Sequence, residues 1–115
     1  MNESLRVETS RRDGGVIVFR LVGRLDSHGA MQLRQQCEQH AAEHGKLVLN
    51  LKDVTFLSSS GVGVLVALTE TLRENGGAVH LAEVGGTVYA TLQLLNLDRH
   101  LSIHSSEEEA IRLAA

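Results

Sequence analysis

Hydrophobic positions at the start of the chain alternate with polar ones in the manner of a β-hairpin. Leu5, Val7 and Thr9 are separated by polar residues, and residues 16–22 (VIVFRLV) form a second, mostly apolar run. An Arg-Asp-Gly-Gly sequence at 12–15 separates the two runs, and such a pair of glycines after aspartate is typical of a tight hairpin turn. These residues predict two antiparallel strands.

The segment after the hairpin changes to helical periodicity. Residues 23–27 (GRLDS) break the strand pattern, and both Asp26 and Ser27 are suited to cap a helix N-terminus. Gly45 then marks the end of the helix. The apolar residues in between recur at intervals of three and four: Ala30, Leu33, Cys37 and Ala41. This spacing predicts a helix with one buried face.

The second half of the chain repeats the alternation of short apolar runs and helical segments. Short runs rich in Leu and Val predict buried strands, whereas longer segments made of good helix formers predict helices. In chain order we predict a strand at 46–51, a helix at 62–72 ended by Asn75-Gly76-Gly77, a strand at 78–84, a helix through Val88, Leu92 and Leu95, a short strand at 101–104, and a C-terminal helix capped by Ser106 with an acidic first turn at 107–109.

This alternation of strands and helices predicts an α/β fold. Crossovers through helices make the sheet largely parallel, so we expect four to five strands, an antiparallel strand from the N-terminal hairpin, and about four helices. A chain of 115 residues is the size of one compact domain, which we expect to span residues 1–115. With two Phe, one Tyr and no Trp, its core must be aliphatic.

The net charge of the chain argues against one class of partner, nucleic acids. The formal net charge is −3 and the chain contains no block of basic residues. Because nucleic-acid binding needs concentrated positive charge, we expect no nucleic-acid partner. The first fifteen residues have no apolar signal-peptide core, and no run approaches the roughly 18–20 apolar residues of a membrane span. We therefore expect a cytoplasmic protein that does not insert into a membrane.

Potential metal ligands are few. Cys37 is the single cysteine, and its place on an apolar helix stripe indicates a small buried hydrophobe. His40 and His44 lie one helical turn apart, but no third ligand is near them, and Glu38 and Glu43 fit a solvated face. We predict neither a metal nor another cofactor.

The stretch FLSSSGVGVL at residues 56–65 carries the most distinctive chemistry. It lies between a predicted buried strand and a helix start, which is where open α/β sheets place their ligand sites. Gly61 and Gly63 match two glycines of a dinucleotide-binding fingerprint, but Val66 stands at the third position. A phosphate-binding loop needs a lysine at the helix start, and the helix carries no basic residue before Arg73. Nucleotide binding is therefore disfavoured.

A serine hydrolase is another interpretation, and the sequence leaves it open. A nucleophilic serine needs an adjacent base, commonly a histidine held by a carboxylate. Ser58 and Ser59 stand where the first glycine of a nucleophile elbow would fall. His28, His80 and His100 are distant in sequence and could reach the cluster only through folding. We predict no catalytic residue.

The small residues of the cluster predict an uncluttered hydroxyl at a helix N-terminus. One serine is enough to cap the helix, and the glycines permit a tight turn. Three serines and two glycines also leave a surface that a partner's active site can approach closely. With no base or cationic clamp nearby in the sequence, the hydroxyl depends on that partner for both. This is the profile of a substrate rather than of an enzyme.

These residues resemble the central motif of STAS domains of the anti-sigma factor antagonist type. Residues 54–64 (VTFLSSSGVGV) are similar to the family's Asp-Ser-Ser/Thr-Gly-x-Gly, which follows a strand. Residues 23–26 (GRLD) resemble its Gly-x-Leu-Asp before the first helix. Residues 95–98 and 106–110 resemble later landmarks, so the resemblance covers nearly the whole chain. Ser58 stands where the family usually has aspartate.

The resemblance implies a regulatory binding module. Such antagonists bind an anti-sigma factor serine/threonine kinase and thereby free a sigma factor. The kinase then phosphorylates the residue before the first glycine, here Ser60, and a serine phosphatase resets the protein. Phosphate adds about −1.5 to −2 charges, and the resulting repulsion can break a tight interface. The residues implied in partner binding are Asp26, Ser58, Ser59, Gly61 and Gly63.

A non-switching role is the alternative that the resemblance leaves open. STAS domains also occur as subunits of large signalling assemblies and beside lipid-transport machinery, where the serine site can be silent. The serine at position 58 in place of the usual aspartate keeps this alternative in view.

Overall fold

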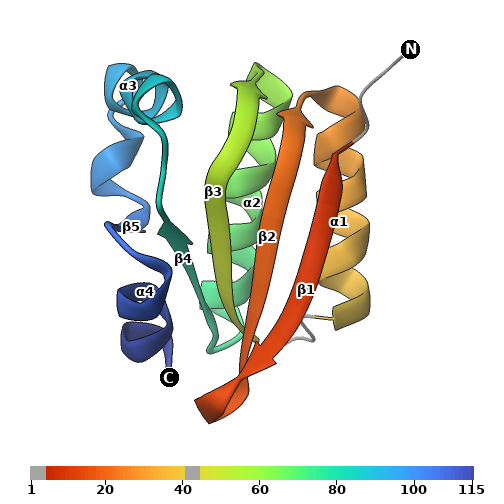
Figure 1. The fold of residues 1–115 in the computed structure, drawn as a ribbon, viewed down its shortest axis with the longest axis vertical. Coiled ribbons are helices and arrows are strands. Elements are labelled where there is room, and N and C mark those ends of the chain that lie inside the picture. Colours follow the sequence, from red (N-terminus) through yellow and green to blue (C-terminus); the bar gives the residue numbers. More distant parts are fainter. Residues whose placement is uncertain (1–4, 41–44) are drawn as a thin grey trace.

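A five-stranded sheet organises the computed structural model, which describes residues 5–40 and 45–115 (Figure 1). The strand order is β1-β2-β3-β4-β5; β1 and β2 are antiparallel, and the other neighbours are parallel. The strands are β1 (Arg6–Arg12), β2 (Val16–Leu25), β3 (Lys46–Leu57), β4 (Ala78–Ala82) and β5 (Ser102–His104). The predicted α/β sheet with its N-terminal antiparallel strand is confirmed.

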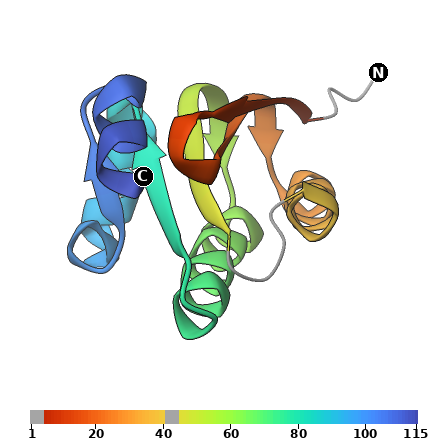
Figure 2. The ribbon, with the colours of Figure 1, turned by 90° about the horizontal axis from the view of Figure 1, so that it is seen from below.

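The helices cover both faces of this sheet. They are α1 (Ser27–His40), α2 (Ser59–Glu74), α3 (Gly86–Leu94) and α4 (Glu107–Ala114), with short 3-10 turns at Asp13–Gly15 and Leu97–Arg99. Figure 2 shows α1 and α2 side by side below the sheet, away from the hairpin. Helix α4 packs instead against the opposite face of β2 and β3. Within the described residues, no helix is both long and apolar enough to cross a bilayer.

Two apolar clusters, one on each face, hold the layers together. Successive strand side chains point to opposite faces, so Phe19 joins the cluster under α1 and α2 whereas Val18 joins the one under α4. The first cluster also includes Leu33, Leu49, Leu65, Leu81 and Leu92; the second includes Val16, Val48, Ala82, Ala110, Ile111 and Ala114. Phe19 is the one aromatic residue among them, as the composition led us to expect.

Strands β2 and β3 are longer than predicted. We placed the ends of these strands at Val22 and Leu51, but their pairing continues to Leu25 and Leu57. The register shifts near Gly23, which has a φ of 118° that favours glycine. At each of two register shifts β3 contains one residue more than β2, between Asn50 and Asp53 and between Val54 and Phe56. Residues 23–25 therefore stay paired, and the end of β2 lies beside the start of α2.

Other boundaries differ by a few residues. Helix α2 begins at Ser59 rather than at residue 62, because its first turn is capped. Strand β4 ends at Ala82, two residues early, where Glu83 takes a left-handed conformation with a φ of 55°. Ala41, which we predicted on the buried face of α1, lies outside the described residues.

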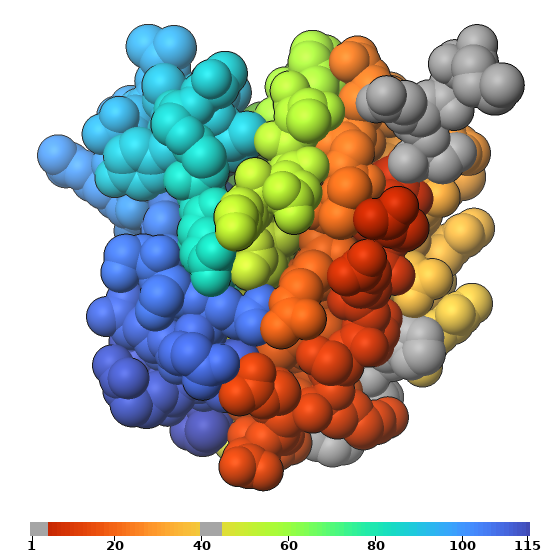
Figure 3. All heavy atoms as spheres, viewed as in Figure 1, coloured from red at the N-terminus to blue at the C-terminus, as the bar shows by residue number. Residues whose placement is uncertain are grey.

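The C-terminal helix is held by an ion pair that the sequence did not reveal. Ser106 caps α4 as predicted, since its hydroxyl accepts the Glu109 N–H at 3.1 Å. Glu107 is buried, however, and accepts two hydrogen bonds from Arg20, at 2.9 and 2.6 Å, and one from Asn50 at 3.0 Å. Figure 3 shows the blue C-terminal segment against the red and orange hairpin.

Candidate functional site

The serine cluster begins α2 where β3 ends, directly beside the end of β2. Ser58 is the N-cap: its hydroxyl accepts the Gly61 N–H at 3.1 Å and donates to the Leu25 carbonyl at 3.3 Å. Its backbone N–H also donates to that carbonyl, at 3.0 Å. An aspartate here could accept from Gly61 but could not donate to Leu25. The serine at position 58 therefore suits the contact between α2 and β2.

The two glycines of the motif have different roles. Gly61 is buried, and a Cβ there would overlap the Leu25 carbonyl oxygen and lie 2.9 Å from the Leu57 Cδ1. It lets α2 approach β2 closely. Gly63 is exposed, and a Cβ there would meet nothing within 4 Å. Its missing side chain leaves open surface beside the serines.

Ser60 presents its hydroxyl at the protein surface. Its side chain projects from the first turn of α2 and is exposed, as is that of Ser59. The Ser60 Oγ lies 3.1 Å from the Oγ of Ser27, the first residue of α1. Within the described part of the chain, this small hydroxyl is its one side-chain hydrogen-bond partner. The oxygen is therefore within reach of a visiting protein.

Asp26 closes the start of α1. Its carboxylate accepts the Gly29 N–H at 2.9 Å, which confirms the predicted cap. This hydrogen bond lowers the pKa of Asp26, burial opposes the shift, and Arg24 at 3.6 Å adds to it. The Arg24 guanidinium also lies 4.1 Å from the centre of the Phe56 ring, which is 40% exposed. A charged and an aromatic group thus flank the serines on the β2–β3 side.

A shallow depression of about 470 Å³ joins Ser60 to α1. Its lining residues fall at helical intervals of three and four, so each helix contributes one face. They are Ser27, Ala30, Met31 and Arg34 from α1, and Ser60, Gly63 and Val64 from α2. Met31 is 57% exposed and offers an apolar contact. Arg34 is the one charged side chain in this lining.

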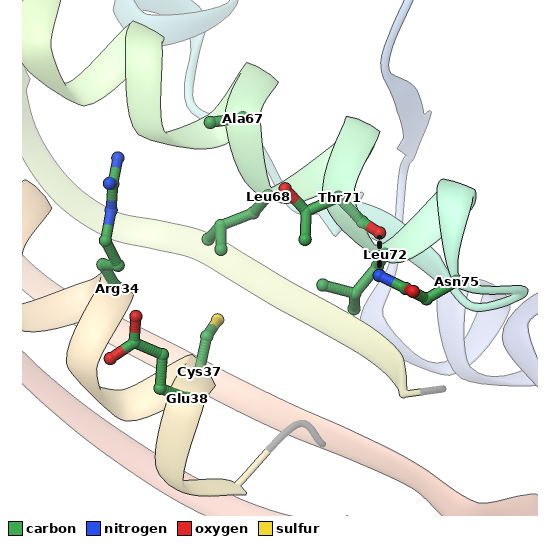
Figure 4. A pocket seen from close by; sticks show the side chains of 8 residues that line it. All are labelled: Arg34, Cys37, Glu38, Ala67, Leu68, Thr71, Leu72 and Asn75. Atoms are coloured by element: carbon green, nitrogen blue, oxygen red, sulfur yellow. Dashed lines mark hydrogen bonds between the residues drawn. The ribbon is translucent and has the colours of Figure 1, made fainter. Parts of the chain in front are cut away.

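A second depression, of about 410 Å³, continues along the same two helices and shares Arg34 (Figure 4). Cys37 and Leu68 line it from opposite helices. Burial raises the pKa of the Cys37 thiol to about 12, so it is not a reactive thiolate at neutral pH. The prediction of a small buried hydrophobe at Cys37 is confirmed.

The histidines that could have served a hydrolase do not meet the serine cluster. His80 on β4 has its Nδ1 atom 2.9 Å from the Nε2 atom of His104. Among the side chains that the structure describes, no imidazole hydrogen-bonds to Ser58, Ser59 or Ser60, and no group of three potential ligands could hold a metal ion. The His40–His44 pair falls outside the side chains that the structure describes.

Several residues around the serine cluster were not predicted from the sequence. Ser27 was predicted only as a helix cap, and Met31, Arg34 and Phe56 were not predicted as part of the site. A signal was present in the helical spacing of Ser27, Met31 and Arg34, which places them on one face of α1. That this face meets the start of α2 follows only from the packing of the two helices.

Comparison with known proteins agrees with this geometry. A family model described as STAS domain matches residues 8–110. The chain is 30% identical over 115 residues to the anti-sigma F factor antagonist of Paenibacillus polymyxa, covering 96% of this chain and 94% of that protein.

Solved structures show the same similarity. An anti-sigma factor antagonist from Mycobacterium paratuberculosis is 25% identical, with 96% of this chain and 94% of that one covered and a TM-score of 0.84. The Bacillus protein SpoIIAA in its unphosphorylated form is 27% identical, with 94% and 95% covered and a TM-score of 0.74.

Proposed function

The chain belongs to the STAS domain family, and we propose that it acts there as an anti-sigma factor antagonist. It binds an anti-sigma factor serine/threonine kinase in the cytoplasm, releases a sigma factor, and is switched off by phosphorylation of Ser60. The observation that carries this proposal is the exposed Ser60 hydroxyl, which hydrogen-bonds to another hydroxyl and, among the described residues, to no base. The anti-sigma factor antagonists among its relatives support the same role.

The surface around Ser60 provides the docking area for the kinase. Asp26 and Ser59 lie at the starts of the two helices, and Gly63 leaves open space beside Ser60. Met31 and Phe56 add partly exposed apolar area, which interfaces use as anchors. Ser58 and Gly61 contribute indirectly, by fixing where α2 starts.

Phosphorylation then adds negative charge to this surface. The γ-phosphoryl group of ATP passes to the Ser60 Oγ, the hydroxyl proton goes to a base of the kinase, and ADP leaves. Added charge at a tight interface costs binding through repulsion and desolvation. The N-terminus of α2 favours an anion, so the domain itself stays folded. SpoIIAA, which is known in unphosphorylated and phosphorylated forms, supports such a switch, and a serine phosphatase would reverse it.

A binding measurement with a charge at position 60 tests the proposal. We expect Ser60→Asp to weaken binding to the cognate kinase at least tenfold, about 1.4 kcal/mol, while the melting temperature stays within a few degrees. Ser105→Asp is a matched control, because Ser105 is an exposed serine before α4 on the opposite face of the sheet. Equal binding by all three proteins would contradict the switch and favour a non-switching STAS subunit.

A further inference from the structure

The depression beside Ser60 is lined by one arginine that forms no ion pair within the described residues. Arg34 lines it from α1, and none of the hydrogen bonds or ion pairs found within the described residues involves Arg34. Arg24, the other arginine at this end of α1, is already paired with Asp26 at 3.6 Å. Among the described residues that line this depression, none is acidic. Arg34 is therefore available to an anion that enters it.

The packing of the two helices directs Arg34 toward Ser60. Ser27 and Arg34 are seven residues, about two turns, apart on α1, and Ser27 contacts Ser60 across the groove. Helix side chains lean toward the helix N-terminus, which for α1 is the end where Ser60 lies. Figure 4 shows the Arg34 guanidinium reaching up from α1 toward α2, on the N-terminal side of Ala67. Arg34 and Ser60 therefore line one depression from facing helices.

We infer that a phosphate on Ser60 is held by Arg34 across the groove between α1 and α2. The inference rests on the proposed phosphorylation of Ser60 and deepens it. A guanidinium and a phosphate form charge-assisted, often bidentate hydrogen bonds, which are stronger than those between neutral groups. The phosphate then fills the depression and joins the two helices, so the modified protein presents a closed, altered surface. Arg34 is a positioning residue for the phosphate.

Glu38 is the nearest acidic residue to Arg34 along the chain. It lies one turn further along α1 and lines the second depression, which Arg34 also borders. The two side chains form no ion pair in the unmodified protein. Arg34 therefore borders both depressions, one lined by the Glu38 carboxylate and the other by Ser60, where the phosphate would be attached. Because the doubly charged phosphate attracts it more strongly, modification draws Arg34 toward Ser60.

Phosphorus NMR of the full chain carrying phosphoserine at position 60 tests this inference. Incorporation of phosphoserine during translation makes the sample independent of any kinase. We expect the pKa of the phosphate to lie about 0.5 units higher in Arg34→Ala than in the unsubstituted chain, which is typical of a solvent-accessible pair. Arg34→Lys should fall between them. The matched control Arg73→Ala removes an exposed cation near the far end of α2 and should leave this pKa unchanged.

A second readout separates pairing from a general change in the protein. The Arg34→Ala substitution should lower the melting temperature of the phosphorylated chain and leave that of the unmodified chain unchanged. Equal phosphate pKa values with and without Arg34 would overturn the inference. So would an equal shift in Arg73→Ala, which would indicate only the overall charge. A kinase that fails to modify Ser60 would refute the proposed function while leaving this titration interpretable.

Discussion

The Oγ atoms of Ser27 and Ser60 lie 3.1 Å apart, although 33 positions separate the two residues in sequence. Each stands in the first turn of its helix, so this hydrogen bond marks the point where the starts of α1 and α2 meet. The candidate site is therefore shared by two helices. A substitution in α1 should therefore change the affinity of a partner that modifies Ser60 on α2.

Ser27 offers a direct test of this shared surface. We expect Ser27→Asp to weaken binding to the kinase by roughly tenfold, about 1.4 kcal/mol, because it places a carboxylate beside Ser60. Ser27→Ala removes one exposed hydrogen bond and should change the affinity by less than about threefold. Calorimetric titration of both variants checks the prediction. If Ser27→Asp bound as well as the unsubstituted chain, the interface would not extend to α1.

The glycines at positions 61 and 63 should respond in opposite ways to the same substitution. Gly61→Ala is expected to lower the free energy of unfolding by about 1–3 kcal/mol, because the new Cβ overlaps the Leu25 carbonyl. Gly63→Ala meets open space and should raise it by up to about 1 kcal/mol, since alanine favours the helix. Urea denaturation of both variants distinguishes them. Similar destabilisation by the two would show that the close approach at Gly61 is not special.

Glu107 should make stability depend on pH at the acidic end. The hydrogen bond from Arg20 lowers its pKa, burial opposes this, and the hydrogen bond from Asn50 adds to the lowering. The carboxylate therefore contributes stability above its ordinary pKa of 4.5, and this is lost as the pH falls through the lowered value.

We expect Glu107→Gln to cost about 1 kcal/mol at neutral pH, a modest figure because Arg20 is half exposed and solvent screens the pair. The difference from the unsubstituted chain should shrink as the pH falls through the lowered pKa of Glu107 and the carboxylate becomes protonated. Denaturation curves recorded from neutral to acidic pH measure it. A cost that stayed constant with pH would mean that packing, not charge, is what the substitution removes.

His80 should make the free energy of unfolding depend on pH in a higher range than Glu107 does. Burial, with a further contribution from His104, lowers the pKa of His80 below its ordinary value of 6.5. Protons then bind the unfolded chain more readily, so the free energy of unfolding is highest above pH 6.5 and falls as the pH drops below it. Glu109 lies 3.7 Å from His104 and faces this pair from α4.

We expect His80→Gln to flatten the decline in stability between about pH 7 and pH 5. Chemical denaturation of the variant and the unsubstituted chain across this range checks it. If the free energy of unfolding declined with pH as steeply in the variant as in the unsubstituted chain, groups other than His80 would cause the decline.

The order and type of the elements followed from the sequence because each carries its own periodicity. Alternation in the hairpin and the spacing of Ala30, Leu33 and Cys37 are local patterns. The predicted ends of β2 and β3 were wrong because register shifts let the two strands stay paired beyond Gly23, and the sequence does not show that these strands are neighbours. A local motif that resembles a break can thus remain part of a strand.

The site was predictable in its centre but not at its edges. The small residues around Ser60 stand out in the sequence, and the structure confirms that this hydroxyl is exposed. Its neighbour Arg34 comes from another helix, and the partner of Glu107 lies 87 positions away. The acidic first turn of α4 predicted a favourable helix dipole, yet Glu107 is mainly held by Arg20. Such pairs depend on how layers pack, which no local pattern encodes.

The most direct test of the account is to incubate the chain with its cognate kinase and ATP and to map the modified residue by mass spectrometry. We predict one phosphate, located on Ser60, and none in Ser60→Ala, whose fold should be intact because the side chain is exposed. Phosphate on another residue, or none on a chain that binds the kinase, would contradict it.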